Sequence, residues 1–121
     1  ALMAVATPMA LNAVKQAKAS QVAQNLSNIM TALQNYVNLE HDFTTDIDAL
    51  VSKGYLSSKP DKYTIVATPT GSTWSSSGEK RVRVQYGGND VDVEKGVRKQ
   101  NPNVKNVGGV PTLEATFTKW W

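Results

Sequence analysis

Few residues of this chain have side chains suited to covalent or metal chemistry. The 121 residues include no cysteine and one histidine, His41. This excludes a thiol nucleophile, a disulfide, a thiolate metal site and a multi-histidine zinc site. Asp42 follows His41, but no Gly-x-Ser-x-Gly motif is present to complete a hydrolytic triad. A lone histidine after a helix end is more often a surface residue or charge partner, so we expect no enzyme activity.

Residues 71–80 form the other segment that invites comparison with a catalytic or binding motif. They contain glycines, serines and a lysine, but their spacing does not fit the phosphate-binding pattern Gly-x4-Gly-Lys-Ser/Thr. We predict a solvated loop, in which Trp74 either packs on a sheet or is exposed for contact.

Oxygen-bearing side chains are closely spaced after residue 88. Asn89, Asp90 and Asp92 are candidate calcium ligands, because calcium prefers carboxylate and amide oxygens. The glycine and distant glutamate of an EF-hand are not in register. Capping of a helix by the acidic residues explains the cluster equally well. Calcium is therefore an alternative, and we expect no organic cofactor.

Charge is distributed unevenly along the chain, whose formal net charge is +3. Basic residues of the second half include Lys80, Arg81, Arg83, Lys95, Arg98, Lys99 and Lys105, whereas acidic residues of the middle are Glu40, Asp42, Asp46, Asp48 and Asp61. Complementary patches of this kind can draw neighbouring copies together. Arg81, Arg83, Arg98 and Lys99 can also form a phosphate-binding face for nucleic acid, with an aromatic side chain to stack on bases. A solvated strand face is the third interpretation.

The elements that position these groups begin with one long helix over residues 1–39. Val22, Leu26, Ile29, Leu33 and Tyr36 recur at spacings of four and three, which places them on one helical stripe. A helix of about 55–60 Å is longer than the remaining residues can cover. We therefore expect residues 15–39 to lie on a globular head formed by residues 40–121, and the beginning of the helix to protrude.

The first fourteen residues differ from the rest of this helix because none of them is charged. Apolar side chains lie on every side: Leu2, Met3, Val5, Met9, Leu11 and Val14. A helix that is apolar all round must be buried in lipid or among partner chains. At about 21 Å these residues are too short to cross about 30 Å of hydrocarbon alone, but they fit the back half of a segment that does. Pro8 is expected to kink or loosen the helix.

The remaining residues predict a short helix and a small sheet. The helix begins at Thr45 as N-cap, with Asp48 at the capping-box position, and ends at Gly54. Alternating apolar residues predict strands over 63–67, 82–86 and 113–117. Asp90 or Asp92 begins a further short helix that Asn101-Pro102 stops. The two tryptophans at 120 and 121 follow, of which we expect one to pack on the head and the other to meet a neighbouring molecule.

The fold class predicted from these patterns is α+β, with a long N-terminal helix packed on an antiparallel sheet of three to four strands. Two segments add a resemblance. Residues 4–11 (Ala-Val-Ala-Thr-Pro-Met-Ala-Leu) and 15–20 (Lys-Gln-Ala-Lys-Ala-Ser), and then 48–56 (Asp-Ala-Leu-Val-Ser-Lys-Gly-Tyr-Leu), are similar to elements of type IV pilins and type II secretion pseudopilins. The processed Phe-first, glutamate-containing start of that family and its disulfide loop are absent from this sequence, so the resemblance implies that the first part of the mature apolar helix is missing from it.

The resemblance implies a structural subunit of a type IV pilus or related filament, with a type II secretion pseudopilin as the alternative. A DNA-capturing or adhesive minor subunit that uses the basic second half is an alternative of another class. The implied partners are identical or homologous subunits, the bacterial inner membrane before assembly and the assembly machinery, and the implied destination is an extracellular or periplasmic filament. The subunit contacts would be Leu2, Met3, Val5, Pro8, Met9, Leu11 and Val14.

Overall fold

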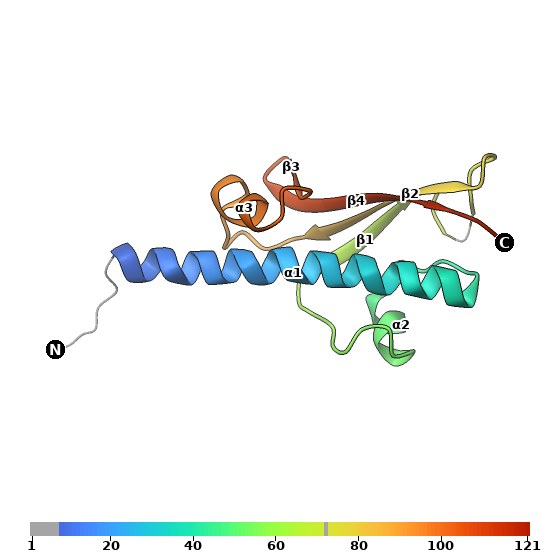
Figure 1. Ribbon diagram of the computed structural model, residues 1–121, viewed down its shortest axis with the longest axis horizontal. Helices are drawn as coiled ribbons and strands as arrows, with labels where there is room; N and C mark the ends of the chain where they lie inside the picture. The colour runs from blue at the N-terminus through green and yellow to red at the C-terminus, as the bar shows by residue number, and fades with distance from the viewer. Residues whose placement is uncertain (1–7, 72) are drawn as a thin grey trace.

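The computed structural model describes residues 8–71 and 73–121, with the side chains of the first helix described from residue 16 onward. Helix α1 (Pro8–Glu40) lies across an antiparallel sheet of four strands. The short helix α2 (Ile47–Ser52) lies beside the C-terminal half of α1 (Figure 1), and its buried residues Ile47 and Leu50 join the core between α1 and the sheet. The predicted α+β architecture, a long helix packed on a small antiparallel sheet, is confirmed.

One stripe of α1 forms the helix side of the hydrophobic core. Val22, Leu26, Ile29 and Leu33 are fully buried and Tyr36 is nearly so, which confirms the predicted stripe. The exposed positions between them carry polar side chains, as expected for a helix that packs on one side. Helix α1 has 33 residues, and at about 1.5 Å per residue it is about 50 Å long.

Helix α2 begins one residue later than predicted. Asp46, not Thr45, is the N-cap, and its carboxylate accepts a hydrogen bond from the backbone N–H of Asp48 at 3.0 Å. Thr44 explains the shift, because its hydroxyl oxygen accepts from the N–H of Asp46 and turns the chain just before the helix. Gly54 follows the helix with φ +84°, a conformation that glycine adopts without strain, as predicted.

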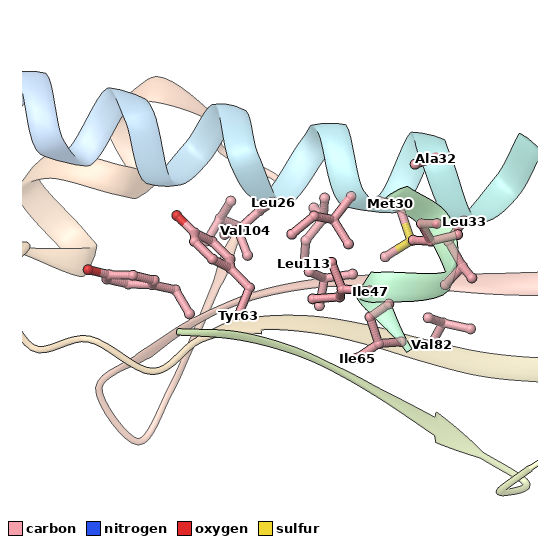
Figure 2. Packing of buried hydrophobic residues seen from close by; sticks show 14 of the residues in the cluster. Leu26, Met30, Ala32, Leu33, Ile47, Tyr63, Ile65, Val82, Val104 and Leu113 are labelled. Carbon is pink, nitrogen blue, oxygen red and sulfur yellow. The ribbon is translucent and has the colours of Figure 1, made fainter. Parts of the chain in front are cut away.

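The sheet consists of β1 (Tyr63–Thr68), β2 (Glu79–Tyr86), β3 (Lys105–Val107) and β4 (Val110–Thr118), in the order β1-β2-β4-β3. All neighbouring strands are antiparallel. Ile65 of β1 lies opposite Val84, which lies opposite Leu113 of β4. This row faces α1, and Figure 2 shows Ile65 and Leu113 beneath Leu26 and Leu33. The three predicted strands are thus confirmed. The fourth, β3, is an edge strand whose sequence has no alternating pattern that would predict it.

A short helical segment connects β2 to β3 and holds the head on α1. It comprises the π-helix η1 (Val93–Val97) and the single turn α3 (Arg98–Gln100). Asp92 is the N-cap, in agreement with one of the two predicted starts, and accepts from the N–H of Lys95 at 2.9 Å. Gly96 lies against Ala19 of α1, where an added Cβ would stand 2.8 Å from the Ala19 methyl carbon. Gly96 therefore allows the close approach of η1 and α1.

Lys80 is not part of a basic surface, contrary to the sequence prediction. Its side chain is buried, and its ammonium donates hydrogen bonds to the backbone carbonyls of Pro69 and Gly71. The Nζ atom also lies 4.7 Å from the centre of the Phe43 ring. Burial lowers the pKa of this ammonium. Lys80 thus fastens the loop after β1 to the core.

Candidate assembly surfaces

Helix α1 extends past the rest of the head at its N-terminal end (Figure 1). The first described side chains, Gln16 and Ala17, are exposed, and Ala19 is the first that is buried. The ammonium of Lys18 lies 3.6 Å from the carboxylate of Asp90 on the head. Contact between helix and head therefore begins at about residue 18, and the turns before it protrude, as the length argument predicted.

The protruding turns contain most of the predicted subunit contacts. Pro8, Met9, Leu11 and Val14 lie on this part of the α1 backbone, and Leu2, Met3 and Val5 lie outside the described residues. Pro8 is the first described residue of α1, so the bend predicted there falls at the boundary of the described residues. Within residues 8–71 and 73–121, no helix combines the length and hydropathy needed to cross a membrane.

A cavity of about 470 Å³ lies where the protruding helix meets the head. Its lining includes Gln16, Lys95 and the three predicted calcium ligands, Asn89, Asp90 and Asp92. The two carboxylates have other partners: Asp90 accepts from the Tyr86 hydroxyl at 2.6 Å, and Asp92 caps η1. Among the described residues, acidic and histidine side chains nowhere gather in a group of three or more that could hold a metal ion. The arrangement therefore favours the capping interpretation over calcium binding.

Buried tyrosines connect this cavity to the core. Tyr86 is 3% exposed, and burial, assisted by the hydrogen bond to Asp90, raises the pKa of its hydroxyl. That same hydrogen bond is the main cause that lowers the pKa of Asp90. The Tyr86 ring centre is 4.9 Å from that of Tyr63, whose hydroxyl accepts from the Asn25 amide at 3.2 Å. Two strands and a loop of the head are thus joined to α1 through polar contacts as well as through the core.

The face of the sheet that points away from α1 is basic. Arg81 and Arg83 alternate along β2 with buried residues, so both side chains point outward. Glu114 of β4 lies 3.1 Å from the Arg83 guanidinium and 2.6 Å from the Lys105 ammonium. The hydrogen bond from Lys105 is the main cause that lowers the pKa of Glu114, and the charges of Lys105, Arg83 and Arg81 lower it further. One carboxylate therefore faces several cations on this surface, which we call the outer face.

Arg81 is the cation of the outer face that forms no ion pair with any residue the structure describes. It lines a depression of about 300 Å³ together with Lys105, Glu114 and Thr116. An anionic group of a partner would find an unpaired guanidinium there, with the fork-shaped donor geometry that suits a carboxylate or phosphate.

The other two predicted basic contacts lie elsewhere. Arg98 and Lys99 belong to α3, not to the sheet. The Arg98 guanidinium is 2.7 Å from Glu94 and also donates to the Val104 carbonyl at 2.9 Å. The structure therefore separates the four predicted residues into two groups on different elements, with Arg98 already engaged.

The region around α2 carries an excess of carboxylates. Around α2 and the segment leading to it lie four acidic residues and two lysines: Glu40, Asp42, Asp46, Asp48, Lys53 and Lys59. Lys53 pairs with Glu40 at 3.0 Å and Lys59 with Asp48 at 3.2 Å. Asp42 and Asp46 form no ion pair within residues 8–71 and 73–121. We call this group of six residues the acidic face.

An aromatic cluster, which the sequence did not predict, closes the end of the head far from the protruding helix. His41 stacks on Trp121 with ring centres 4.7 Å apart, and Trp120 meets His41 edge-on at 5.0 Å. Trp121 also packs edge-on against Trp74, so one of the two last tryptophans packs on the head, as predicted. Trp120 is 63% exposed and donates from its indole to the Asn38 side chain. His41 is thus an aromatic packing partner of the two tryptophans.

Comparison of the chain with protein-family models, with curated proteins and with solved structures finds no match. The case for a function therefore rests on the protruding helix, the two charged faces and the sequence pattern.

Proposed function

We propose that the chain is a structural subunit of a type IV pilus or a related filament, and that it assembles through the apolar beginning of its long helix. The observation that carries the proposal is that α1 protrudes beyond the head at its N-terminal end (Figure 1). The first fourteen residues of the chain, to which this end belongs, include no charged side chain. A type II secretion pseudopilin would use the helix in the same way and is the alternative within this proposal.

Burial of apolar surface supplies the driving force. Each apolar side chain removed from water contributes about 25 cal/mol per Å², and residues 1–14 contain Leu2, Met3, Val5, Met9, Leu11 and Val14. Helices from many subunits would bundle in the core of the filament and leave the polar heads outside. Before assembly, the same segment would be held by the bacterial inner membrane. No catalytic group is needed for this role.

The attachment of the head to α1 supports the proposal. Lys18, Ala19 and Asn25 of α1 each contact the head through a different interaction, namely an ion pair with Asp90, close packing on Gly96 and a hydrogen bond to Tyr63. A head fixed in this way follows the position of its helix. The packing of helices in the filament core would therefore fix the spacing of heads at the surface.

A charge placed in the protruding helix tests the proposal. Full-length Leu11→Lys is compared with Asn28→Lys, which puts the same charge at an exposed position of α1 beside the head. After detergent removal, we expect filaments in electron micrographs of the wild type and of Asn28→Lys but not of Leu11→Lys. The control is circular dichroism of both variants, which should show the helix content of the wild type. Filaments of wild-type length from Leu11→Lys would refute the proposal.

A further inference from the structure

The two charged faces lie on different elements of the fold. The outer face carries Arg81, Arg83 and Lys105 around the carboxylate of Glu114, and Glu79 is exposed on the same side at the start of β2. The outer face lies on β2, β3 and β4, whereas the acidic face lies on the end of α1, on α2 and on the segments beside α2, so the two faces share no residue. A copy can therefore present both faces at once to two different neighbours.

The outer face has the properties of a contact surface. Arg81 has no ion-pair partner in the described part of the chain and borders the depression of about 300 Å³. Val66 and Val107, which lie on the same side of the sheet, are 44% and 41% exposed. No described helix covers this side. Apolar side chains on the same face as an unpaired guanidinium are suited to a partner that brings a carboxylate and excludes water.

The acidic face offers the complementary groups. Its lysines pair with Glu40 and Asp48, whereas Asp42 and Asp46 form no ion pair with any side chain that the structure describes. Both side chains are exposed. Asp46 lies at the start of α2 and beside a groove of about 210 Å³ that also includes Lys59 and Thr64.

We propose that the outer face of one copy docks on the acidic face of the next copy. The occupant of the Arg81 depression is then a carboxylate of α2 or of the segment before it. Two different faces that join head to tail form a heterologous contact, which continues without end unless the rotation closes a ring. This inference rests on the proposed filament and specifies which surfaces of the heads meet in it.

The absence of cysteine from the sequence makes a cross-linking test specific. Thr116→Cys places one thiol on the outer face and Ser52→Cys places one on the acidic face, and both positions are exposed. The two full-length variants are mixed at low salt and treated with a short bis-maleimide. We expect covalent dimers that join Thr116→Cys to Ser52→Cys, and few dimers from either variant alone. Salt of about 0.5 M should suppress them, since it screens exposed charges beyond a few ångströms.

Charge reversal identifies the groups responsible. Arg81→Glu in the Thr116→Cys chain, or Asp42→Lys in the Ser52→Cys chain, should each lower the yield about tenfold, because repulsion replaces attraction across the contact. Mixing the two reversed chains should restore the yield, which also shows that both are folded. The neutral pair Asp42→Asn and Asp46→Asn keeps each backbone hydrogen bond and should lower the yield without reversing it.

Several results would overturn the proposal. These are mixed dimers no more abundant than self-dimers, an Arg81→Glu chain that cross-links like the wild type, and reversed chains that do not recover together. Salt-dependent binding of short duplex DNA that Arg81→Glu abolishes, with unchanged cross-linking, would assign the outer face to nucleic acid instead.

The same experiments distinguish this inference from the proposed function. Wild-type filaments from Arg81→Glu at low salt would refute the contact between faces and leave assembly through the helix standing. Filaments from Leu11→Lys, together with the expected cross-links, would refute assembly through the helix and leave the contact between faces standing.

Discussion

The contact between Gly96 of η1 and Ala19 of α1 gives a sharp test of how the head is held on the helix. A methyl group added in Gly96→Ala would stand 2.8 Å from the Ala19 methyl carbon. Carbon atoms in contact prefer about 3.5–4.0 Å, so η1 and α1 must separate by roughly an ångström or the side chains must distort. Both residues are buried, and the segments that carry them have little freedom to move apart.

The expected change combines two opposing effects. Overpacking of a buried contact costs about 1–3 kcal/mol, whereas alanine favours a helical backbone over glycine by about 1 kcal/mol. The Ala19 methyl carbon is fixed to the backbone and cannot rotate away, which puts the overpacking cost at about 2–3 kcal/mol, so we expect Gly96→Ala to lower the free energy of unfolding by about 1–2 kcal/mol. For a chain of this size, about 4 °C of melting temperature corresponds to each kcal/mol, so the melting temperature should fall by about 4–8 °C.

Thermal unfolding followed by circular dichroism measures this change, and the partner residue supplies the control. Ala19→Gly removes the methyl group that Gly96→Ala would strike. In the double variant the two changes should be coupled by about 1–2 kcal/mol, so the loss should be smaller than the sum of the single losses. A Gly96→Ala protein that melts at or above the wild-type temperature, or single losses that simply add, would refute the close contact.

Three further predictions concern stability. Asp46→Ala should lower the free energy of unfolding by about 0.5–2 kcal/mol in urea titrations, because it removes the N-cap of α2. Thr45→Ala should change the free energy of unfolding little, and an equal loss in the two variants would contradict the assignment of Asp46 as the N-cap. The raised pKa values of Tyr86 and Tyr63 stabilise the fold below pH 10, the ordinary tyrosine value, and this contribution is lost as the pH rises further. Tyr86→Phe should therefore lose stability less steeply above pH 10 than the wild type, and an identical alkaline profile would contradict this. Addition of a calcium chelator should leave the melting temperature unchanged, and a fall would return Asp90 and Asp92 to the list of calcium ligands.

The regular elements were predictable because periodic burial leaves a periodic sequence. The stripe from Val22 to Tyr36 has no competing interpretation, and the alternation through Ile65 and Val84 follows from one buried and one exposed sheet face. Strand β3 could not be predicted, because all three of its residues are exposed and no alternation of buried and exposed side chains marks it. Asp46 was missed as N-cap because Thr44, Thr45 and Asp46 are all good capping residues.

The surfaces were less predictable than the elements. Sequence order places Lys80 beside Arg81, yet alternation along β2 points one into the core and the other to solvent. Strand pairing brings Glu114 to Arg83 from 31 positions away, and no local pattern encodes that meeting. The aromatic cluster likewise brings His41 to Trp121, although the two residues stand near the first and the last positions of the head in the sequence. Once strands are assigned, alternation alone would have identified Lys80 as an inward-facing residue.

The central claim is that the beginning of α1 is buried among other copies of the chain. A nitroxide label on full-length Leu11→Cys, compared with one on Asn28→Cys, tests it in assembled protein by spin-label spectroscopy. Our account predicts that the label at position 11 is shielded from a water-soluble relaxation agent and is broadened by labels on neighbouring copies, while the label at position 28 remains accessible. A shielded label at position 11 in isolated monomers, with no broadening from other copies, would show that the helix folds against its own head and would contradict the account.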